Sequence, residues 1–200
     1  MLVTDDALLA GRDPLPVARA AVVGGATSVQ LRLKGAGDRE LAEIARRLVA
    51  ALPVPVLVND RPDVAIAAGA AGVHLGPDDL PVDAVRRIVP ASFVVGASVG
   101  GAAEAQAACG ADYWGIGPWR VTGTKSDAGA ALGIAGFTAI VRAAQGIPCL
   151  AIGGVRPDDV PAVLSAGGVG VAVVSGLLSA ADVEVAARDY ARLLDERLSG

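Results

Sequence analysis

Residues 55–79 read PVLVNDRPDVAIAAGAAGVHLGPDD, and this stretch decides the fold. An apolar run of the length of a buried strand ends at Asn59, and Pro62 follows where the first turn of a helix tolerates proline. A second apolar run covers residues 72–75 and leads into glycine, proline and aspartate. The stretch therefore predicts a strand, a helix and a second strand, with polar residues directly after each strand.

The same alternation extends over the whole chain. Short apolar runs predict eight strands, at residues 2–4, 28–33, 55–59, 72–75, 93–98, 113–117, 149–152 and 169–174. Apolar residues between them recur with helical period, as Leu41, Ala45 and Leu48 do. Repeated strand and helix units of this kind are typical of a parallel sheet covered by helices.

Eight such units most simply close into a (β/α)₈ TIM barrel, a single compact α/β domain over residues 1–200. A doubly wound open sheet is the alternative. That fold would need a G-x-G-x-x-G turn after the first strand for a dinucleotide, and only Gly24-Gly25 is present there. We therefore expect the barrel.

Composition excludes several classes of protein. A chain of 200 residues with 53% hydrophobic content can bury one sizeable core. A net charge of −4 and 3% aromatic residues argue against a nucleic-acid binder. The two cysteines lack metal or disulfide spacing, which fits a reducing compartment. Residues 1–4 resemble no signal peptide, and Pro161 and glycines interrupt the uncharged run 160–181. We expect a cytoplasmic protein without membrane spans, and the sequence does not define its oligomeric state.

Lysine is rare in this chain, which has only Lys34 and Lys125, each just beyond a predicted strand. Lys125 follows Thr122, Gly123 and Thr124 on the loop after the strand at 113–117. Two hydroxyls, several loop amides and an ammonium group suit a phosphate or a pyrophosphate. The alternative for each lysine alone is a solvated loop residue, but their shared position at strand ends favours a functional role.

Polar residues at the ends of buried parallel strands also require an explanation. Gln30, Arg32 and Lys34 are spaced by two, so they share one face, and the two cations would meet an anion. Asp60 follows the next strand, and Asp78 and Asp79 follow the one after it. Asp60 with one of the latter pair could hold Mg²⁺, although capping of the helices at Pro62 and Pro81 is the competing role.

Three further positions complete the predicted site. His74 is the one histidine, and we expect a structural hydrogen-bonding role for it. Ser98 ends the fifth strand, where it could donate to an oxyanion. Gly153-Gly154 and Val174-Ser175-Gly176 follow the seventh and eighth strands, where barrels frequently bind phosphate through backbone amides.

The chain resembles the thiamine-phosphate synthases and their relatives, the thiazole tautomerases, over nearly its whole length. Ordered motifs carry the resemblance: residues 2–5 (LVTD), 29–34 (VQLRLK), 58–60 (VND), 72–79 (GVHLGPDD), 110–118 (GADYWGIGP), 122–125 (TGTK) and 151–155 (AIGGV). The resemblance implies a transferase of thiamine biosynthesis that joins 4-amino-5-hydroxymethyl-2-methylpyrimidine diphosphate to a thiazole phosphate and releases pyrophosphate. Its expected partners are these small phosphorylated molecules.

The resemblance also implies roles for individual residues. Asp60 and Asp79 would bind Mg²⁺, and Lys125, Arg32, Lys34 and Ser98 would act in catalysis. The diphosphate would be held by Arg32, Lys34, Asn59 and Lys125, and the pyrimidine side would contact Gln30 and Ser98. The thiazole phosphate would be held by Thr122, Gly123, Thr124, Gly154, Val174 and Ser175.

Departures from the family pattern leave two other functions open. Pro77 stands where the family usually has Gln, Val121 stands where it usually has Pro, and the segment after Lys34 is short. A thiazole tautomerase is one alternative, although that branch is expected to carry a histidine shortly after the serine, where this chain has Gly100-Gly101. A non-catalytic barrel that binds thiazole or thiamine phosphate is the other.

Overall fold

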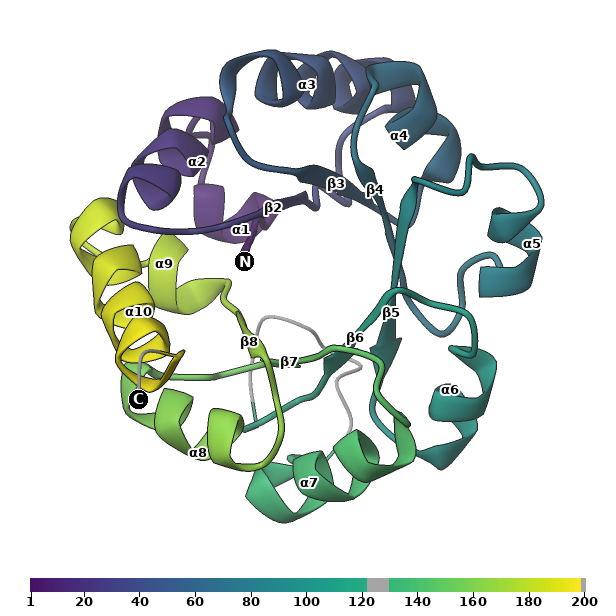
Figure 1. The fold of residues 1–200 in the computed structure, drawn as a ribbon. Helices are drawn as coiled ribbons and strands as arrows, with labels where there is room; N and C mark the ends of the chain where they lie inside the picture. The colour runs from purple at the N-terminus through teal and green to yellow at the C-terminus, as the bar shows by residue number, and fades with distance from the viewer. Residues whose placement is uncertain (122–129, 199–200) are drawn as a thin grey trace.

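The computed structural model describes residues 1–121 and 130–198. Its core is a sheet of eight parallel strands in sequence order, which the helices surround (Figure 1). The strands are β1 (Leu2–Val3), β2 (Val29–Leu31), β3 (Val56–Asn59), β4 (Gly72–Leu75), β5 (Val94–Val99), β6 (Tyr113–Ile116), β7 (Cys149–Ile152) and β8 (Gly170–Ala172). A parallel bridge between Leu2 and Val173 joins β1 to β8, and the N–H of Val3 donates to the Val173 carbonyl at 2.9 Å. The sheet therefore closes, and the predicted (β/α)₈ barrel is confirmed.

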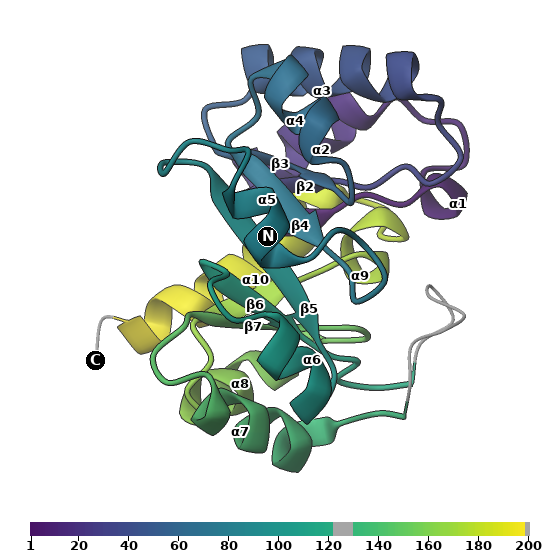
Figure 2. The same ribbon diagram turned by 90° about the vertical axis from the view of Figure 1, so that its right-hand side faces the viewer.

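Helices follow the strands around the outside of the barrel, as the side view in Figure 2 also shows. They are α1 (Asp6–Leu9), α2 (Pro14–Val23), α3 (Asp38–Ala51), α4 (Pro62–Ala68), α5 (Val82–Arg86), α6 (Ala102–Ala107), α7 (Gly133–Ala143), η1 (Pro157–Asp159), α8 (Val160–Ser165), α9 (Ser175–Leu178) and α10 (Val183–Leu198). Within the described ranges, no helix is both long and apolar enough to cross a membrane.

Local sequence explains most element boundaries. Helix α3 buries Leu41, Ala45 and Leu48 on one face, as its helical period predicts. Pro62 opens α4, and Gly69 closes it with a φ of 69°, a left-handed conformation that glycine adopts without strain. Every predicted strand is present, but β2 and β8 are shorter than expected, because β2 pairs with β3 only as far as Leu31 and β8 pairs with β7 only as far as Ala172.

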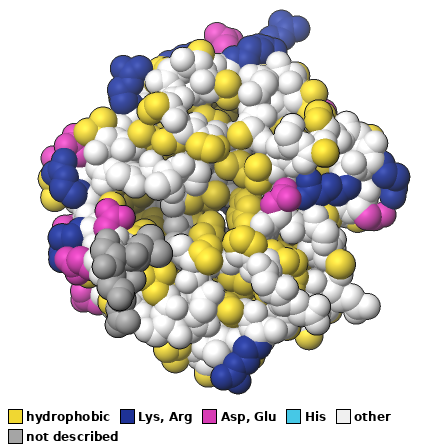
Figure 3. Space-filling model, in the orientation of Figure 1, with side chains coloured by type: hydrophobic (Ala, Val, Ile, Leu, Met, Phe, Trp, Pro, Cys, Tyr) yellow, Lys and Arg dark blue, Asp and Glu magenta, His cyan; other side chains and the backbone are white. Residues whose placement is uncertain are grey.

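Apolar side chains fill the space between barrel and helices. Aliphatic side chains of the strands are almost fully buried, among them Leu31, Val58, Val73 and Ile116. On the face seen in Figure 3, hydrophobic side chains gather around the centre and most of the charged ones lie toward the rim. Helices cover the outer face of the strands and side chains fill the interior of the barrel. Polar side chains therefore lie mainly at the strand ends, where the site is found.

Candidate active site

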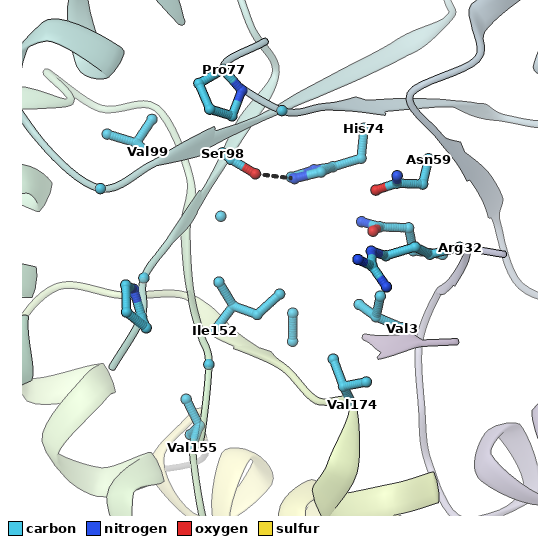
Figure 4. A pocket seen from close by; sticks show the side chains of 18 of the residues that line it. Val3, Arg32, Asn59, His74, Pro77, Ser98, Val99, Ile152, Val155 and Val174 are labelled. Carbon is cyan, nitrogen blue, oxygen red and sulfur yellow. Dashed lines mark hydrogen bonds between the residues drawn. The ribbon is translucent and has the colours of Figure 1, made fainter. Parts of the chain in front are cut away.

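A cavity of about 710 Å³ opens at the carboxyl ends of the strands. Its wall includes every predicted site residue that the structure describes: Gln30, Arg32, Lys34, Asn59, Asp60, Asp79, Ser98, Gly154, Val174 and Ser175. Figure 4 shows Arg32 and Asn59 on one side of this pocket, with Ile152 and Val155 across from them. The predicted residues from six strand ends thus meet in one place. Thr122, Gly123, Thr124 and Lys125 lie outside the described residues.

Arg32 is held by the residues that follow β1. Its guanidinium donates to Asp5 Oδ2 at 2.7 Å, and Asp5 is only 7% exposed. The Arg32 backbone N–H donates to Thr4 Oγ1 at 2.8 Å, and that hydroxyl donates to the Arg32 carbonyl at 3.1 Å. The end of β1 therefore fixes both the backbone and the charge of Arg32 beside the pocket.

Lys34 and the two predicted metal ligands form one charged cluster. The Lys34 ammonium lies 2.6 Å from Asp60 Oδ2. Burial alone would raise the pKa of Asp60, but hydrogen bonds with Asp79 and Lys34 outweigh it and lower that pKa. Burial and the hydrogen bond with Asp60 raise the pKa of Asp79 to about 6. The two carboxyl groups therefore lie within hydrogen-bond distance of each other, and Asp60 makes ionisation of Asp79 less favourable.

The competing role for these aspartates, helix capping, is wrong. The N-cap of α4 is Arg61 and that of α5 is Pro81, and neither helix start receives a side-chain hydrogen bond. Asp79 instead accepts from the backbone N–H of Gly76 at 2.6 Å, and Asp60 has a φ of 65°. Neither carboxylate is therefore engaged as a helix cap, and both line the pocket.

The Asp60 and Asp79 pair fits a magnesium ion. Mg²⁺ prefers one or two carboxylates and takes its other oxygens from water and substrate phosphates. Two adjacent carboxyl groups supply such a ligand pair, since a divalent cation offsets the repulsion between two neighbouring carboxylates. In residues 1–121 and 130–198, no group of three or more His, Cys, Asp or Glu side chains could hold a metal.

His74 contacts a residue of the predicted site, although only a structural role was predicted for it. Its Nε2 lies 3.0 Å from Ser98 Oγ, as the dashed line in Figure 4 marks, and its Nδ1 lies 2.8 Å from the Tyr113 hydroxyl. His74 is 6% exposed and lines the pocket. The hydrogen-bonding role is confirmed, and its partners lie in the predicted site.

Glycines shape the opposite end of the pocket. Gly153 and Gly154 have φ values of 87° and 71°, and a Cβ on Gly153 would lie 2.8 Å from Pro118 Cα. Ser175 begins α9, whose first backbone N–H groups have no partner within the helix. Positive φ values and close packing therefore explain the glycine pair, and the arrangement suits an anion.

Sequence reasoning missed three residues of this region. Asp5 had appeared only within a motif, although it binds Arg32. Tyr113 falls within a predicted strand and a motif of the resemblance but has no predicted role, although its hydroxyl contacts His74. Glu104 lines the pocket and accepts a hydrogen bond from the Gly100 backbone. The one sequence signal for Tyr113 is the alternation of side chains along its strand. Tyr113 lies on the same face as Gly115 and Gly117, and both glycines line the pocket.

Fold and site together define a (β/α)₈-barrel enzyme with a pocket lined by charged and polar residues at the carboxyl ends of its strands. The family model described as thiamine monophosphate synthase matches residues 1–177. The chain therefore belongs to the thiamine monophosphate synthase family, and it is an enzyme of the transferase class.

Individual relatives agree with this assignment. The thiamine-phosphate synthase of Azorhizobium caulinodans is 47% identical over 199 residues, which cover 97% of this chain and 93% of the relative. That of Xanthobacter autotrophicus is 51% identical over 94% of this chain and 90% of its own length. The solved thiamine phosphate pyrophosphorylase of Pyrococcus furiosus superposes with a TM-score of 0.86 at 37% identity, covering 98% of this chain and 96% of its own.

Proposed function

We propose that this protein is a cytoplasmic, Mg²⁺-dependent thiamine-phosphate synthase. It would join 4-amino-5-hydroxymethyl-2-methylpyrimidine diphosphate to a thiazole phosphate and release pyrophosphate. One observation carries the proposal: all ten described residues predicted for this reaction line a single cavity, which is large enough for small phosphorylated molecules. The names of its relatives support the same reaction.

The charged end of the pocket would hold the diphosphate. Arg32 and Lys34 supply positive charge and Asn59 supplies an amide donor. The family resemblance would add Lys125, which lies outside the described residues. Arg32 is positioned to bind the diphosphate because its ion pair with Asp5 holds the guanidinium in place. When bound by Asp60 and Asp79, Mg²⁺ would neutralise part of the diphosphate charge.

The reaction requires a good leaving group more than an acid or a base. Cleavage of the C–O bond between the pyrimidine methylene and the diphosphate would leave a carbocation, which the thiazole nitrogen captures. Fixed cations around the departing pyrophosphate stabilise the charge that develops on it. Val3, Ile152 and Val174 form apolar parts of the wall, which would keep water from the cation.

The glycine end would hold the second substrate. Gly154, Val174 and Ser175 line the pocket there, and Thr122, Gly123 and Thr124 belong to the same proposed phosphate site. Gln30 and Ser98 would face the pyrimidine between the two anionic ends. The two phosphorylated groups would thus bind at opposite sides of the cavity, with the reacting atoms between them.

The test is product formation from the two substrates and Mg²⁺, with thiamine phosphate detected after oxidation to fluorescent thiochrome. We expect product that chelation abolishes. Asp60→Asn should lower kcat/KM by about 100-fold or more, because a carboxylate of the metal pair is lost. Asparagine tolerates the φ of 65° at this position, so the fold should be retained.

Asp63→Asn is the matched control, since Asp63 is an exposed aspartate on α4 that pairs with Arg61 outside the pocket. It should turn over like the unmodified protein. Absence of product while phosphate ligands still bind would reject the synthase and favour the binding barrel. Conversion of a thiazole phosphate alone without metal would favour the tautomerase.

A further inference from the structure

Three polar side chains on neighbouring strands form a continuous chain of hydrogen bonds beside the pocket. Tyr113 of β6 lies at 2.8 Å from Nδ1 of His74 on β4, and Nε2 of His74 lies at 3.0 Å from Oγ of Ser98 on β5. Of the three, His74 and Ser98 line the pocket, whereas Tyr113 does not. An effect of Tyr113 on the pocket is therefore transmitted through its hydrogen bond with His74.

Two glycines create the space for these three hydrogen-bonded side chains. In the strand register His74 pairs with Gly96, and Gly96 pairs with Tyr113. A Cβ on Gly96 would lie 2.1 Å from Cζ of Tyr113, so the tyrosine ring crosses β5 where no side chain stands. A Cβ on Gly115 would lie 3.2 Å from Cε1 of His74. The contact between Tyr113 and His74 thus depends on two positions without side chains.

The two hydrogen bonds of His74 can run in one direction, from Tyr113 to Ser98. Burial raises the pKa of the Tyr113 phenol, which keeps it neutral, while the Gln30 side chain acts in the opposite sense. A neutral phenol has a proton to donate to Nδ1 of His74. The imidazole would then carry its own proton on Nε2 and donate it to Ser98 Oγ.

We propose that Tyr113 is a positioning residue that sets the tautomer of His74 and thereby makes Ser98 donate its hydroxyl proton into the pocket. A serine oxygen that accepts from His74 directs its own proton elsewhere, and Ser98 lines the pocket. The recognised group is a hydrogen-bond acceptor such as a ring nitrogen. The functional part of this inference rests on the proposed function, in which Ser98 contacts the pyrimidine.

The direct test needs no substrate. The chain has one histidine, so labelling with ¹⁵N-histidine gives the signals of a single imidazole. A long-range ¹H–¹⁵N spectrum on the alkaline side of neutrality should show the proton on Nε2. In Tyr113→Phe the proton should redistribute toward Nδ1, whereas Tyr190→Phe should match the unmodified protein, because the Tyr190 hydroxyl donates to the Val155 carbonyl elsewhere. A proton on Nδ1 in the unmodified protein, or no change in Tyr113→Phe, overturns the proposal.

Kinetics test whether Tyr113 acts through Ser98. Tyr113→Phe should lower kcat/KM for the pyrimidine diphosphate about five- to tenfold, the effect of one net hydrogen bond. The Tyr113→Phe, Ser98→Ala double variant should be no slower than Ser98→Ala alone, whereas additive losses would reject the coupling. If the unmodified protein forms no product, the proposed function fails, and the spectrum still decides the position of the proton.

Discussion

Asp5 shows how one carboxylate serves both the fold and the site. It accepts from the Leu8 backbone N–H at 3.2 Å as the N-cap of α1, and from Arg32 at 2.7 Å. Asparagine is an equally good N-cap but cannot form the ion pair. A substitution to asparagine therefore separates the two contributions.

We predict that Asp5→Asn lowers kcat/KM for the pyrimidine diphosphate about tenfold, because Arg32 loses the partner that orients it. The free energy of unfolding should fall by about 1–3 kcal/mol, since a half-buried guanidinium loses its charge partner. Urea unfolding and steady-state kinetics measure the two effects.

Asp13→Asn is the matched control, because Asp13 caps α2 and pairs with Arg47 in an exposed position. It should change stability by less than about 1 kcal/mol and leave kcat/KM unchanged. Equal kinetic losses in both variants would contradict a specific role for Asp5.

At the scale of elements, the turn between β7 and η1 is built by its backbone conformation. Gly153 and Gly154 both have positive φ, and a Cβ on Gly154 would lie 3.1 Å from Cβ of Arg120. Arg120 donates to the Gly154 carbonyl at 3.2 Å and to Asp159 Oδ1 at 2.6 Å, which ties the turn to η1. This connection holds the turn against the pocket.

Gly154→Ala should weaken the binding of inorganic phosphate or thiazole phosphate at least about fivefold, because the new methyl group displaces the turn. Gly146→Ala provides the control for backbone strain alone. Gly146 has a φ of 97°, no neighbouring residue in the described part of the chain lies within 4 Å of an added Cβ, and Gly146 is not among the described residues that line the pocket. Calorimetric titration should detect weaker binding in Gly154→Ala only, while both variants lose about 1 kcal/mol or more of stability.

At the scale of the whole molecule, the closed barrel couples the site to global stability. The pocket draws residues from strands all around the barrel, and the Leu2 to Val173 bridge joins the first strand to the last. A ligand that binds only the folded state stabilises every strand that contributes to its site.

Pyrophosphate with Mg²⁺ should therefore raise Tm in a single cooperative transition. At about 100 times Kd the expected stabilisation is about 2.7 kcal/mol. Circular dichroism and the fluorescence of Trp114 and Trp119, both buried, should report the same midpoint. In Asp60→Asn the Mg²⁺-dependent part of the shift should disappear, and a shift that persists there would place the metal elsewhere.

The amino-acid sequence by itself determined the strands, their parallel arrangement and most of the pocket. Alternating apolar runs reveal strands because burial on both faces demands continuous hydrophobicity, and period two placed Gln30, Arg32 and Lys34 on one face. Polar residues directly after such strands meet at one end of a barrel whatever their exact register.

Only the tertiary structure decided which of those residues touch. Whether Asp60 caps a helix or pairs with Asp79 depends on where α4 begins and on its own φ of 65°. The contact between Tyr113 and His74 depends on the register that sets Gly96 between them. Such contacts join residues far apart in the chain, and their distances follow from strand pairing and packing, which no local pattern encodes.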